Sequence, residues 1–265
     1  MSGLIVEDLA FAYGASPVLR GITLPPLLPG RVTAVIGPNA AGKSTFFKCL
    51  AGLLASQGSL WLDGVNLKRL TSGERARRIA YLPQETAVQA VLTVFEAVLL
   101  ARQHAITWRV RDDDLAAVGR VLGEMRLTEL ALRYLNELSG GQRQLVSIAQ
   151  ALAREPRVLL LDEPTSHLDL QHQLEVLARL RRATLDRELI TLFAVHDLNL
   201  AARYADHLIV LAGGTIYAAG TAEAVLTPTM LRAVYGVHGT VAPGPDGRPQ
   251  VTPLAPVPPP AAVPG

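Results

Sequence analysis

A glycine-rich segment near the start of the chain has the residue types and spacing of a phosphate-binding loop. Gly37-Pro38-Asn39-Ala40-Ala41-Gly42-Lys43-Ser44-Thr45 fits the pattern G-x-x-x-x-G-K-[ST]. The two glycines let the backbone wrap closely around phosphates, so amide N–H groups converge on the anion at the positive end of a helix. Lys43 then reaches the β and γ phosphates, and the Ser44 hydroxyl can take a magnesium position. The alternative, an ordinary glycine turn that caps a helix, is disfavoured by the strand and helix expected on either side.

Two carboxylates follow an apolar run later in the chain. Residues 158–161 are predicted to form a buried strand, and Asp162 and Glu163 come directly after it. Ligands of open α/β sheets gather outside the carboxyl ends of the strands, which places these acids beside the phosphate loop. Asp162 can hold magnesium, directly or through water, and Glu163 is left to polarise an attacking water. A helix-capping turn before Pro164 is the alternative, and the glycine loop makes it the less favoured one.

The elements that must position these residues follow an α/β pattern. Short apolar runs alternate with helical patterns, which predicts a covered, mostly parallel sheet. The predicted strands are residues 32–36, 158–161, 189–195 and 208–211. The helix after the glycine loop has an apolar stripe, formed by Phe46, Phe47, Leu50 and Leu53.

Three other regions have patterns of their own. Residues 4–35 contain short alternating runs split by glycines and prolines, which predicts an antiparallel β layer. Residues 87–154 are mainly helical and are predicted to form an inserted subdomain. Its two apolar stripes are Val94, Val98 and Ala101, and Leu145, Ile148, Ala149 and Leu152. From residue 242 onward nine of the 18 prolines occur without apolar periodicity, which predicts an extended tail outside the core.

Length and composition exclude several classes of protein. The 265 residues suit one large domain, and 49% hydrophobic with 18% charged residues excludes a disordered chain. A formal charge of +2 gives no strong field that would draw the chain onto nucleic acid. The single cysteine, Cys49, excludes a disulfide framework and is expected to be a small core residue of an intracellular protein. Neither a signal peptide nor a run of about 18 apolar residues is present in the sequence, which predicts no secretion and no membrane span.

A further motif carries a family resemblance. Leu138-Ser139-Gly140-Gly141-Gln142 matches the signature of ATP-binding cassette (ABC) ATPases and lies between the glycine loop and Asp162, as that family requires. Ser139 and Gln142 also form a capping box, and both interpretations can hold. The resemblance implies a P-loop NTPase cassette at residues 1–240, with the helical subdomain inserted and a Pro-rich tail at 241–265. It also implies ATP hydrolysis by two cassettes packed head to tail, each signature closing over the γ phosphate held by the other chain.

Other positions resemble family residues, each with a structural alternative. Tyr13 resembles the aromatic that stacks on adenine, although a lone strand aromatic is more often core. Gln84 resembles the glutamine that senses magnesium and the attacking water. His196 resembles the switch histidine that hydrogen-bonds the γ phosphate, although a lone histidine at a strand end is usually structural. Residues 166–169 resemble the loop that contacts the partner cassette, and Asp169 also predicts an N-cap.

One position departs from the family pattern. Ala40 stands where many relatives have a third glycine, and alanine is penalised if that position requires a positive φ. We expect unimpaired or slightly altered nucleotide affinity, because the core pattern requires only Gly37 and Gly42.

Two segments narrow the resemblance. Residues 92–102 and 195–206 are similar to ATPase subunits of bacterial importers for ferric siderophores, haem and cobalamin. The resemblance implies ATP and Mg²⁺ as cofactors, a second copy and membrane permease subunits as partners, and indirectly a solute-binding protein. It places the chain peripherally at the cytoplasmic face of the membrane, with no nucleic acid expected. The alternative is a non-transport ABC ATPase acting on nucleic acid or the ribosome; no sustained heptads are present for the chromosome type, and the length holds only one cassette.

Overall fold

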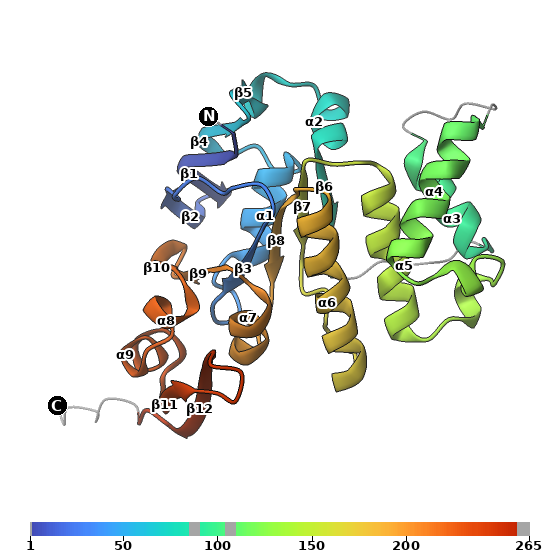
Figure 1. Cartoon of the computed structure of the whole chain (residues 1–265). Helices are drawn as coiled ribbons and strands as arrows, with labels where there is room; N and C mark the ends of the chain where they lie inside the picture. Colours follow the sequence, from blue (N-terminus) through green and yellow to red (C-terminus); the bar gives the residue numbers. More distant parts are fainter. Residues whose placement is uncertain (1, 85–90, 104–109, 259–265) are drawn as a thin grey trace.

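The architecture is built on a mostly parallel sheet, as the sequence predicts. The computed structural model describes residues 2–84, 91–103 and 110–258. Six strands lie in the order β10-β9-β3-β8-β7-β6, and only β10 runs antiparallel to its neighbour (Figure 1). Their bounds are β3 Arg31–Ile36, β6 Ile79–Leu82, β7 Val158–Leu161, β8 Ile190–Ala194, β9 His207–Ala212 and β10 Thr215–Gly220. Every residue of β7 and β8 is buried, because helices or the second sheet cover both faces.

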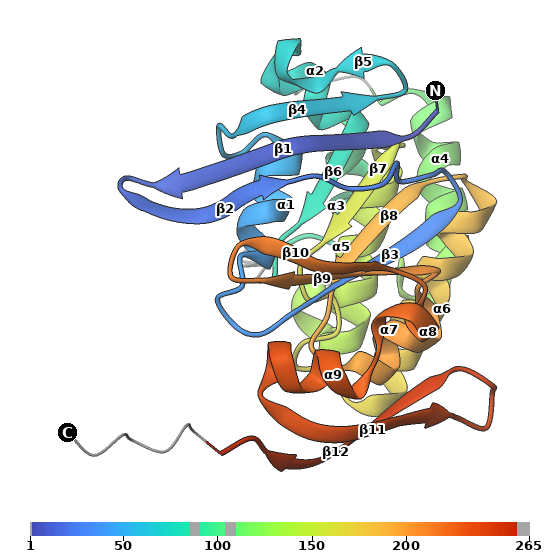
Figure 2. The same ribbon diagram turned by 90° about the vertical axis from the view of Figure 1, so that its left-hand side faces the viewer.

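The antiparallel layer predicted at the N-terminus is a second sheet. It has the order β2-β1-β4-β5, with β1 Leu4–Tyr13, β2 Ser16–Ile22, β4 Gln57–Leu62 and β5 Val65–Asn66. Figure 2 shows its long strands crossing the strands of the parallel sheet. Leu4, Val6 and Leu60 pack with Phe46 and Phe47 in one apolar core between the two sheets. The strands β4 and β5 were not predicted, because their residues come after the phosphate-loop helix and outside the N-terminal pattern.

The helix after the glycine loop, α1 (Lys43–Ala51), is shorter than its predicted stripe. Phe46, Phe47 and Leu50 are buried, but Leu53 is 63% exposed. Gly52 adopts the left-handed conformation and ends the helix with backbone N–H donation to Cys49 and Lys48. The inclusion of Leu53 in the buried stripe is therefore wrong.

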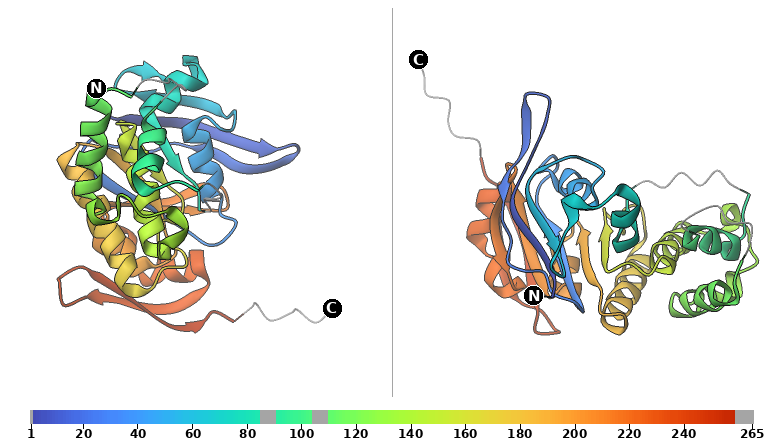
Figure 3. Two further views of the ribbon diagram at one scale, coloured as in Figure 1. Left: turned by 90° about the vertical axis from the view of Figure 1, so that its right-hand side faces the viewer. Right: turned by 90° about the horizontal axis from the view of Figure 1, so that it is seen from above.

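The remaining helices lie around the parallel sheet or project to one side of it (Figure 1 and Figure 3). They are α2 Ser72–Arg78, α3 Val94–Arg102, α4 Asp112–Glu124, α5 Gly140–Ala153, α6 Leu170–Asp186, α7 Leu198–Tyr204, α8 Ala222–Val225 and α9 Pro228–Met230. A π-helical turn at Leu231–Tyr235 follows α9. In the part of the chain that the structure describes, no helix combines the length and apolarity needed to cross a membrane.

The predicted helical subdomain consists of α3, α4 and α5, which project to one side of the parallel sheet, away from the N-terminal sheet (Figure 3). Thr93 and Ser139 form capping boxes at the starts of α3 and α5. Residue 87, the predicted start of the subdomain, lies outside the described residues.

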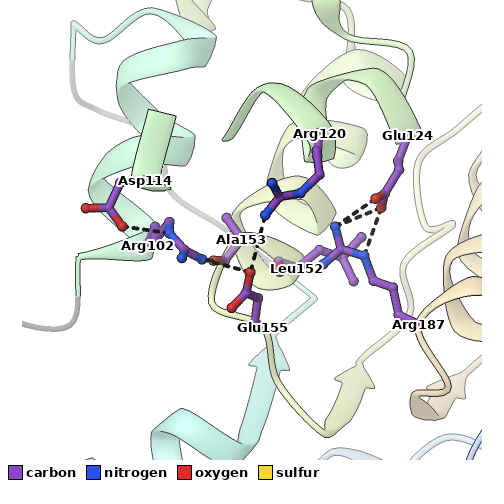
Figure 4. A network of polar contacts seen from close by, with 8 residues as sticks. All are labelled: Arg102, Asp114, Arg120, Glu124, Leu152, Ala153, Glu155 and Arg187. Atoms are coloured by element: carbon purple, nitrogen blue, oxygen red, sulfur yellow. Dashed lines mark hydrogen bonds and ion pairs between the residues drawn. The ribbon is translucent and has the colours of Figure 1, made fainter. Parts of the chain in front are cut away.

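An ion-pair network ties this subdomain to the core (Figure 4). Arg187, at the end of α6, lies 2.8 Å from a carboxylate oxygen of Glu124 on α4 and donates to the Leu152 carbonyl at 3.0 Å. Arg102, at the end of α3, donates to Asp114 at 2.8 Å and to the Ala153 carbonyl at 3.0 Å. The last carbonyls of α5 thus accept hydrogen bonds from two arginines, and the positive charges stabilise the negative end of this helix.

The Pro-rich C-terminal segment differs from the prediction. The strands β11 (Val237–Pro243) and β12 (Pro249–Pro256) form an antiparallel hairpin that lies against α7 and α9 (Figure 2). Val251 of β12 is buried in the core. The expectation that residues from 241 form a tail outside the core is therefore wrong for the hairpin. Prolines are tolerated in a two-stranded ribbon because both strands are edge strands, where outward-facing positions need no backbone N–H donor. Residues 259–265 lie outside the described part of the chain.

Candidate active site

The glycine loop connects β3 to α1 and has the geometry of a phosphate cradle. Gly37 has a φ of 150°, and a Cβ there would lie 2.1 Å from the Leu211 carbonyl oxygen. Gly42 has a φ of 100° and lies against Val18 and Leu19 of β2. Any larger residue at Gly37 would collide with backbone, so the close approach of β3 and β9 requires glycine.

Lys43 is directed into this loop. Its Nζ donates to the carbonyls of Gly37 at 2.9 Å and Pro38 at 3.1 Å, and the residue is 6% exposed. Burial lowers the pKa of Lys43, and the carboxylates of Glu163 and Asp162 partly oppose that shift. The amine therefore lies among acceptors at the floor of the loop, where a polyphosphate would be neutralised.

Ala40 adopts the conformation that makes alanine costly. Its φ is 60°, in the left-handed region. The condition for a penalty is thus met at this position.

Asp162 has one oxygen bound and one oxygen free for a cation. It follows β7, is 4% exposed, and accepts a hydrogen bond on Oδ2 from the Tyr81 hydroxyl at 3.2 Å. Its buried Oδ1 finds no partner among the described residues. An orphaned buried carboxylate oxygen fits a hard cation such as Mg²⁺. No group of three or more His, Cys, Asp or Glu side chains with metal-binding geometry occurs in residues 2–84, 91–103 and 110–258, so any cation here would need water or phosphate ligands.

Tyr81 was not predicted as a site residue. It lies on β6, and its hydroxyl reaches the acid that follows β7. Burial and the neighbouring Asp162 raise the pKa of Tyr81, so it remains a donor. Its place three residues before Gln84 in the sequence was the available signal.

Glu163 contacts Gln84 and His196, the other two residues that were predicted to be catalytic. Its Oε2 accepts from Gln84 Nε2 at 2.9 Å, and its Oε1 lies 2.5 Å from His196 Nε2. These three residues follow β6, β7 and β8, which are adjacent in the sheet. Glu163 itself has a φ of 53°, an uncommon conformation that often occurs at functional sites.

An open cavity of about 530 Å³ connects the loop with this carboxylate. Its lining includes Gln84, Glu163 and His196, and it also includes the unpredicted Val18 of β2. The loop contributes Asn39, Ala40, Ala41, Gly42, Lys43, Ser44 and Thr45. Val18 carries no chemistry that a sequence pattern could single out; only its contact with Gly42 places it here.

Gly37, Pro38 and Asp162 do not line the cavity, although their neighbours Asn39 and Glu163 do, and two further predicted groups of residues lie away from it. Tyr13 is 52% exposed at the end of β1, where its ring meets Phe11 edge to face at 4.8 Å, and it does not line the cavity. Ser139, Gly140, Gly141 and Gln142 begin α5, and none of them is among its lining residues either. Gly141 instead packs against His172, where a Cβ would lie 2.3 Å from the ring.

The predicted contact loop connects the acids to α6. Ser166 Oγ donates to the Glu163 carbonyl at 3.0 Å. Asp169 accepts from the His172 amide at 2.9 Å, which confirms its N-cap at the start of α6.

Comparison with known proteins agrees with this geometry. A sequence model of the ABC transporter family matches residues 25–166, more than half of the chain. The chain belongs to this family. The hemin import ATP-binding protein HmuV of Pseudomonas fluorescens is 43% identical to this cassette over 255 residues, which cover 94% of the cassette and 98% of HmuV. The ferric enterobactin transport ATP-binding protein FepC of Escherichia coli is 37% identical over 252 residues, covering 94% and 93%.

A solved structure is similar over nearly the whole cassette. It is an inward-facing ABC transporter assigned to the metal-chelate type, with a TM-score of 0.82 and 30% identity over 96% of this chain and 98% of the other. The predicted cassette fold is confirmed, and the chain is an ABC-type ATPase coupled to transport.

Proposed function

We propose that two copies of this cassette hydrolyse ATP head to tail and drive import of a ferric siderophore, haem or cobalamin through a membrane permease. The observation that carries the ATPase mechanism is the Glu163 carboxylate, held between Gln84 and His196 at the edge of the phosphate cavity. The solute class is supported by the names of the relatives, hemin import and ferric enterobactin transport.

Residues 37–45 bind the polyphosphate in this proposal. Backbone amides of the loop surround the phosphates at the start of α1, and Lys43 moves its amine from the Gly37 and Pro38 carbonyls to phosphate oxygens. Ser44, Asp162 and Gln84 are the residues that would hold Mg²⁺, which, when bound, neutralises charge on the phosphate oxygens. Tyr13 offers an exposed ring on which adenine can stack.

Glu163 and His196 orient the attacking water. The Glu163 carboxylate accepts a hydrogen bond from this water and polarises it, while Gln84 fixes the second carboxylate oxygen. The His196 imidazole hydrogen-bonds the γ phosphate and keeps the water in line with it. Phosphoryl transfer asks chiefly for position and charge neutralisation, and these residues supply both.

The signature acts on a nucleotide bound by another copy. The capping box uses the amides of Ser139 and Gln142, which leaves those of Gly140 and Gly141 free among the described residues, yet all four residues lie outside this chain's own phosphate cavity. A head-to-tail pair brings each signature to the partner's γ phosphate, with residues 166–169 in the contact. ATP then acts as the bridge between two faces, so binding closes the pair and hydrolysis reopens it.

The permease binds the helical subdomain. Exposed apolar side chains gather there: Val91, Leu100, Leu132 and Tyr134. Such a surface suits a short helix from a membrane subunit. In this proposal the cassette lies peripherally at the cytoplasmic face of the membrane, and it contacts the permease but never the solute, which a separate binding protein delivers.

Glu163→Gln tests the ATPase mechanism. The amide retains the size of the side chain but exchanges one acceptor oxygen for an N–H donor and polarises water poorly, so ATP binding should persist while turnover falls at least about 100-fold. Nucleotide titration and phosphate release would be measured side by side, and a closed dimer should accumulate with ATP in gel filtration. Glu129→Gln, an exposed glutamate on the subdomain, is the matched control. Undiminished turnover in Glu163→Gln would remove this residue from its role.

Affinity capture of the tagged chain from its own membranes tests the transport assignment. We expect a polytopic permease to copurify, and mass spectrometry of solute retained by the complex should detect an iron chelate, haem or cobalamin. Copurification of ribosomes or nucleic acid near physiological salt, with no permease, would contradict the assignment.

A further inference from the structure

The C-terminal hairpin grips the helix that follows His196. The side-chain amide of Asn199, in the first turn of α7, makes two hydrogen bonds with the backbone of Val251 in β12. Its Oδ1 accepts from the Val251 amide at 2.7 Å, and its Nδ2 donates to the Val251 carbonyl at 3.2 Å. This two-point pairing holds one side-chain orientation, because the donor and acceptor of Val251 are complementary to those of Asn199.

The hairpin also holds the other end of α7. Arg248 donates to the Ala202 carbonyl at 2.9 Å, and Arg203 lies 3.8 Å from Asp246. Val251 places its side chain in the apolar core. A helix of seven residues and a hairpin of two strands are each marginal alone, so each needs the other to stay in place.

The start of α7 connects these hairpin contacts to His196. Asp197 accepts from the Asn199 and Leu200 amides at 2.8 and 3.0 Å and caps the helix. His196 directly precedes this cap, and its imidazole lies 2.5 Å from Glu163. A shift of α7 therefore moves the backbone of His196 relative to the carboxylate.

The turn before the hairpin reaches the other half of the site. Tyr235, the last residue of the π-helical turn, buries its hydroxyl beside the backbone of Gly37. The Val257 amide donates to the Gly236 carbonyl at 2.7 Å and closes the base of the hairpin. The C-terminal segment thus contacts both α7 and the entry of the phosphate loop.

We propose that Asn199 is a positioning residue for ATP hydrolysis, through which the C-terminal hairpin sets the place of His196 against Glu163. The inference rests on the proposed role of His196. A displacement of about 1 Å at a reacting group can reduce a rate by up to about 100-fold, so this grip affects the chemical step more than nucleotide binding.

Asn199→Ala and Asn199→Asp in the full-length chain test the proposal. Asn199→Ala should lower kcat roughly tenfold while KM for ATP changes less than about twofold, because the phosphate loop is untouched. Asn199→Asp retains the acceptor for the Val251 amide but loses the donor to the Val251 carbonyl. Its kcat should therefore lie between that of Asn199→Ala and that of the natural chain. Thr252→Ala, an exposed position on the same strand, is the matched control and should leave kcat unchanged.

A double-mutant comparison separates positioning from general stability. In a His196→Ala background, adding Asn199→Ala should reduce the residual rate no further, because the group being positioned is gone. An unchanged kcat in folded Asn199→Ala, or equal losses with and without His196, would overturn the proposal. If Asn199→Ala does not fold, Arg248→Ala, which releases the other end of α7, is measured in its place and must show the same selective loss. These outcomes are independent of Glu163→Gln, which tests the ATPase mechanism itself.

Discussion

Individual residues in the phosphate loop differ in how strictly their conformation selects their type. Gly37 is required, since a Cβ would meet the Leu211 carbonyl oxygen at 2.1 Å. Ala40 is tolerated at a φ of 60°, because the left-handed region costs an L-residue only about 1 to 2 kcal/mol. Close backbone contact is therefore a stronger constraint here than an unfavourable φ.

Ala40→Gly should change stability and nucleotide affinity little. Relief of the left-handed strain is offset by the greater unfolded-state entropy of glycine, so the free energy of unfolding should rise by no more than about 1 kcal/mol. ATP affinity should remain within about threefold, since less than 0.7 kcal/mol is involved. Denaturant unfolding and ATP titration check this.

Ala41→Gly is the comparison for this substitution. Ala41 has no positive φ and is buried, so glycine there should only destabilise, by about 0.5 to 1 kcal/mol. A gain of more than tenfold in ATP affinity in Ala40→Gly would mean that alanine impairs the natural loop.

Among the elements, the ends of α5 have different partners. Its first residues carry the signature, and its last carbonyls are held by Arg102 from α3 and Arg187 from α6. Arg187 also binds Glu124 of α4, so one side chain connects three helices. The orientation of the signature relative to the core depends in part on these contacts.

Arg187→Ala should destabilise the chain by about 1 to 3 kcal/mol, because it leaves Glu124 and the Leu152 carbonyl without a partly buried charged donor. Arg182→Ala is the matched control: this arginine lies on the same helix, is 78% exposed and, among the described residues, pairs only with Asp186, so its loss should cost less than about 0.5 kcal/mol. Thermal and denaturant unfolding would measure both variants. Equal effects would contradict the role of the network.

At the scale of the whole molecule, the parallel sheet separates two apolar cores. One lies against the helices and the C-terminal hairpin, and the other lies between the two sheets and contains Cys49. Burial raises the pKa of the Cys49 thiol to about 11. Ionisation of this thiol at alkaline pH is therefore less favourable in the folded chain than in the unfolded chain.

The contribution of Cys49 to stability should fall as the pH rises from about 8.5, the ordinary thiol pKa, to about 11. In that window the unfolded chain loses the proton and the folded chain keeps it, so deprotonation favours unfolding, by at most about 1.4 kcal/mol per pH unit. Unfolding free energies of the natural chain and Cys49→Ala would be compared across this range. The free energy of unfolding of the natural chain should fall steadily relative to that of Cys49→Ala as the pH rises. A constant difference would show that the thiol pKa is the same in the folded and unfolded chains.

Much of the fold and site was predictable because its signals are local. The glycine loop, the acids after residues 158–161 and the capping residues Ser139 and Asp169 depend on neighbours in the chain, and the structure has each of them as predicted. Tyr81 and Val18 were missed because their roles arise only from contacts across strands, to Asp162 and Gly42. The family resemblance supplied Gln84 and His196, which composition and spacing alone would have left as ordinary loop and strand-end residues.

The sequence by itself determined the α/β architecture, because periodicity and loop chemistry act over short stretches of chain. The order of its motifs then carried the family resemblance that implied the cassette fold. Only the tertiary structure decided that the Pro-rich C-terminal segment pairs as a hairpin and packs Val251 into the core, since that depends on α7 offering Asn199 at the right place. It also decided that Glu163 meets Gln84 and His196, which are 79 and 33 residues away in the chain. Adjacent parallel strands bring such distant residues to one edge of a sheet, and no local pattern records that proximity.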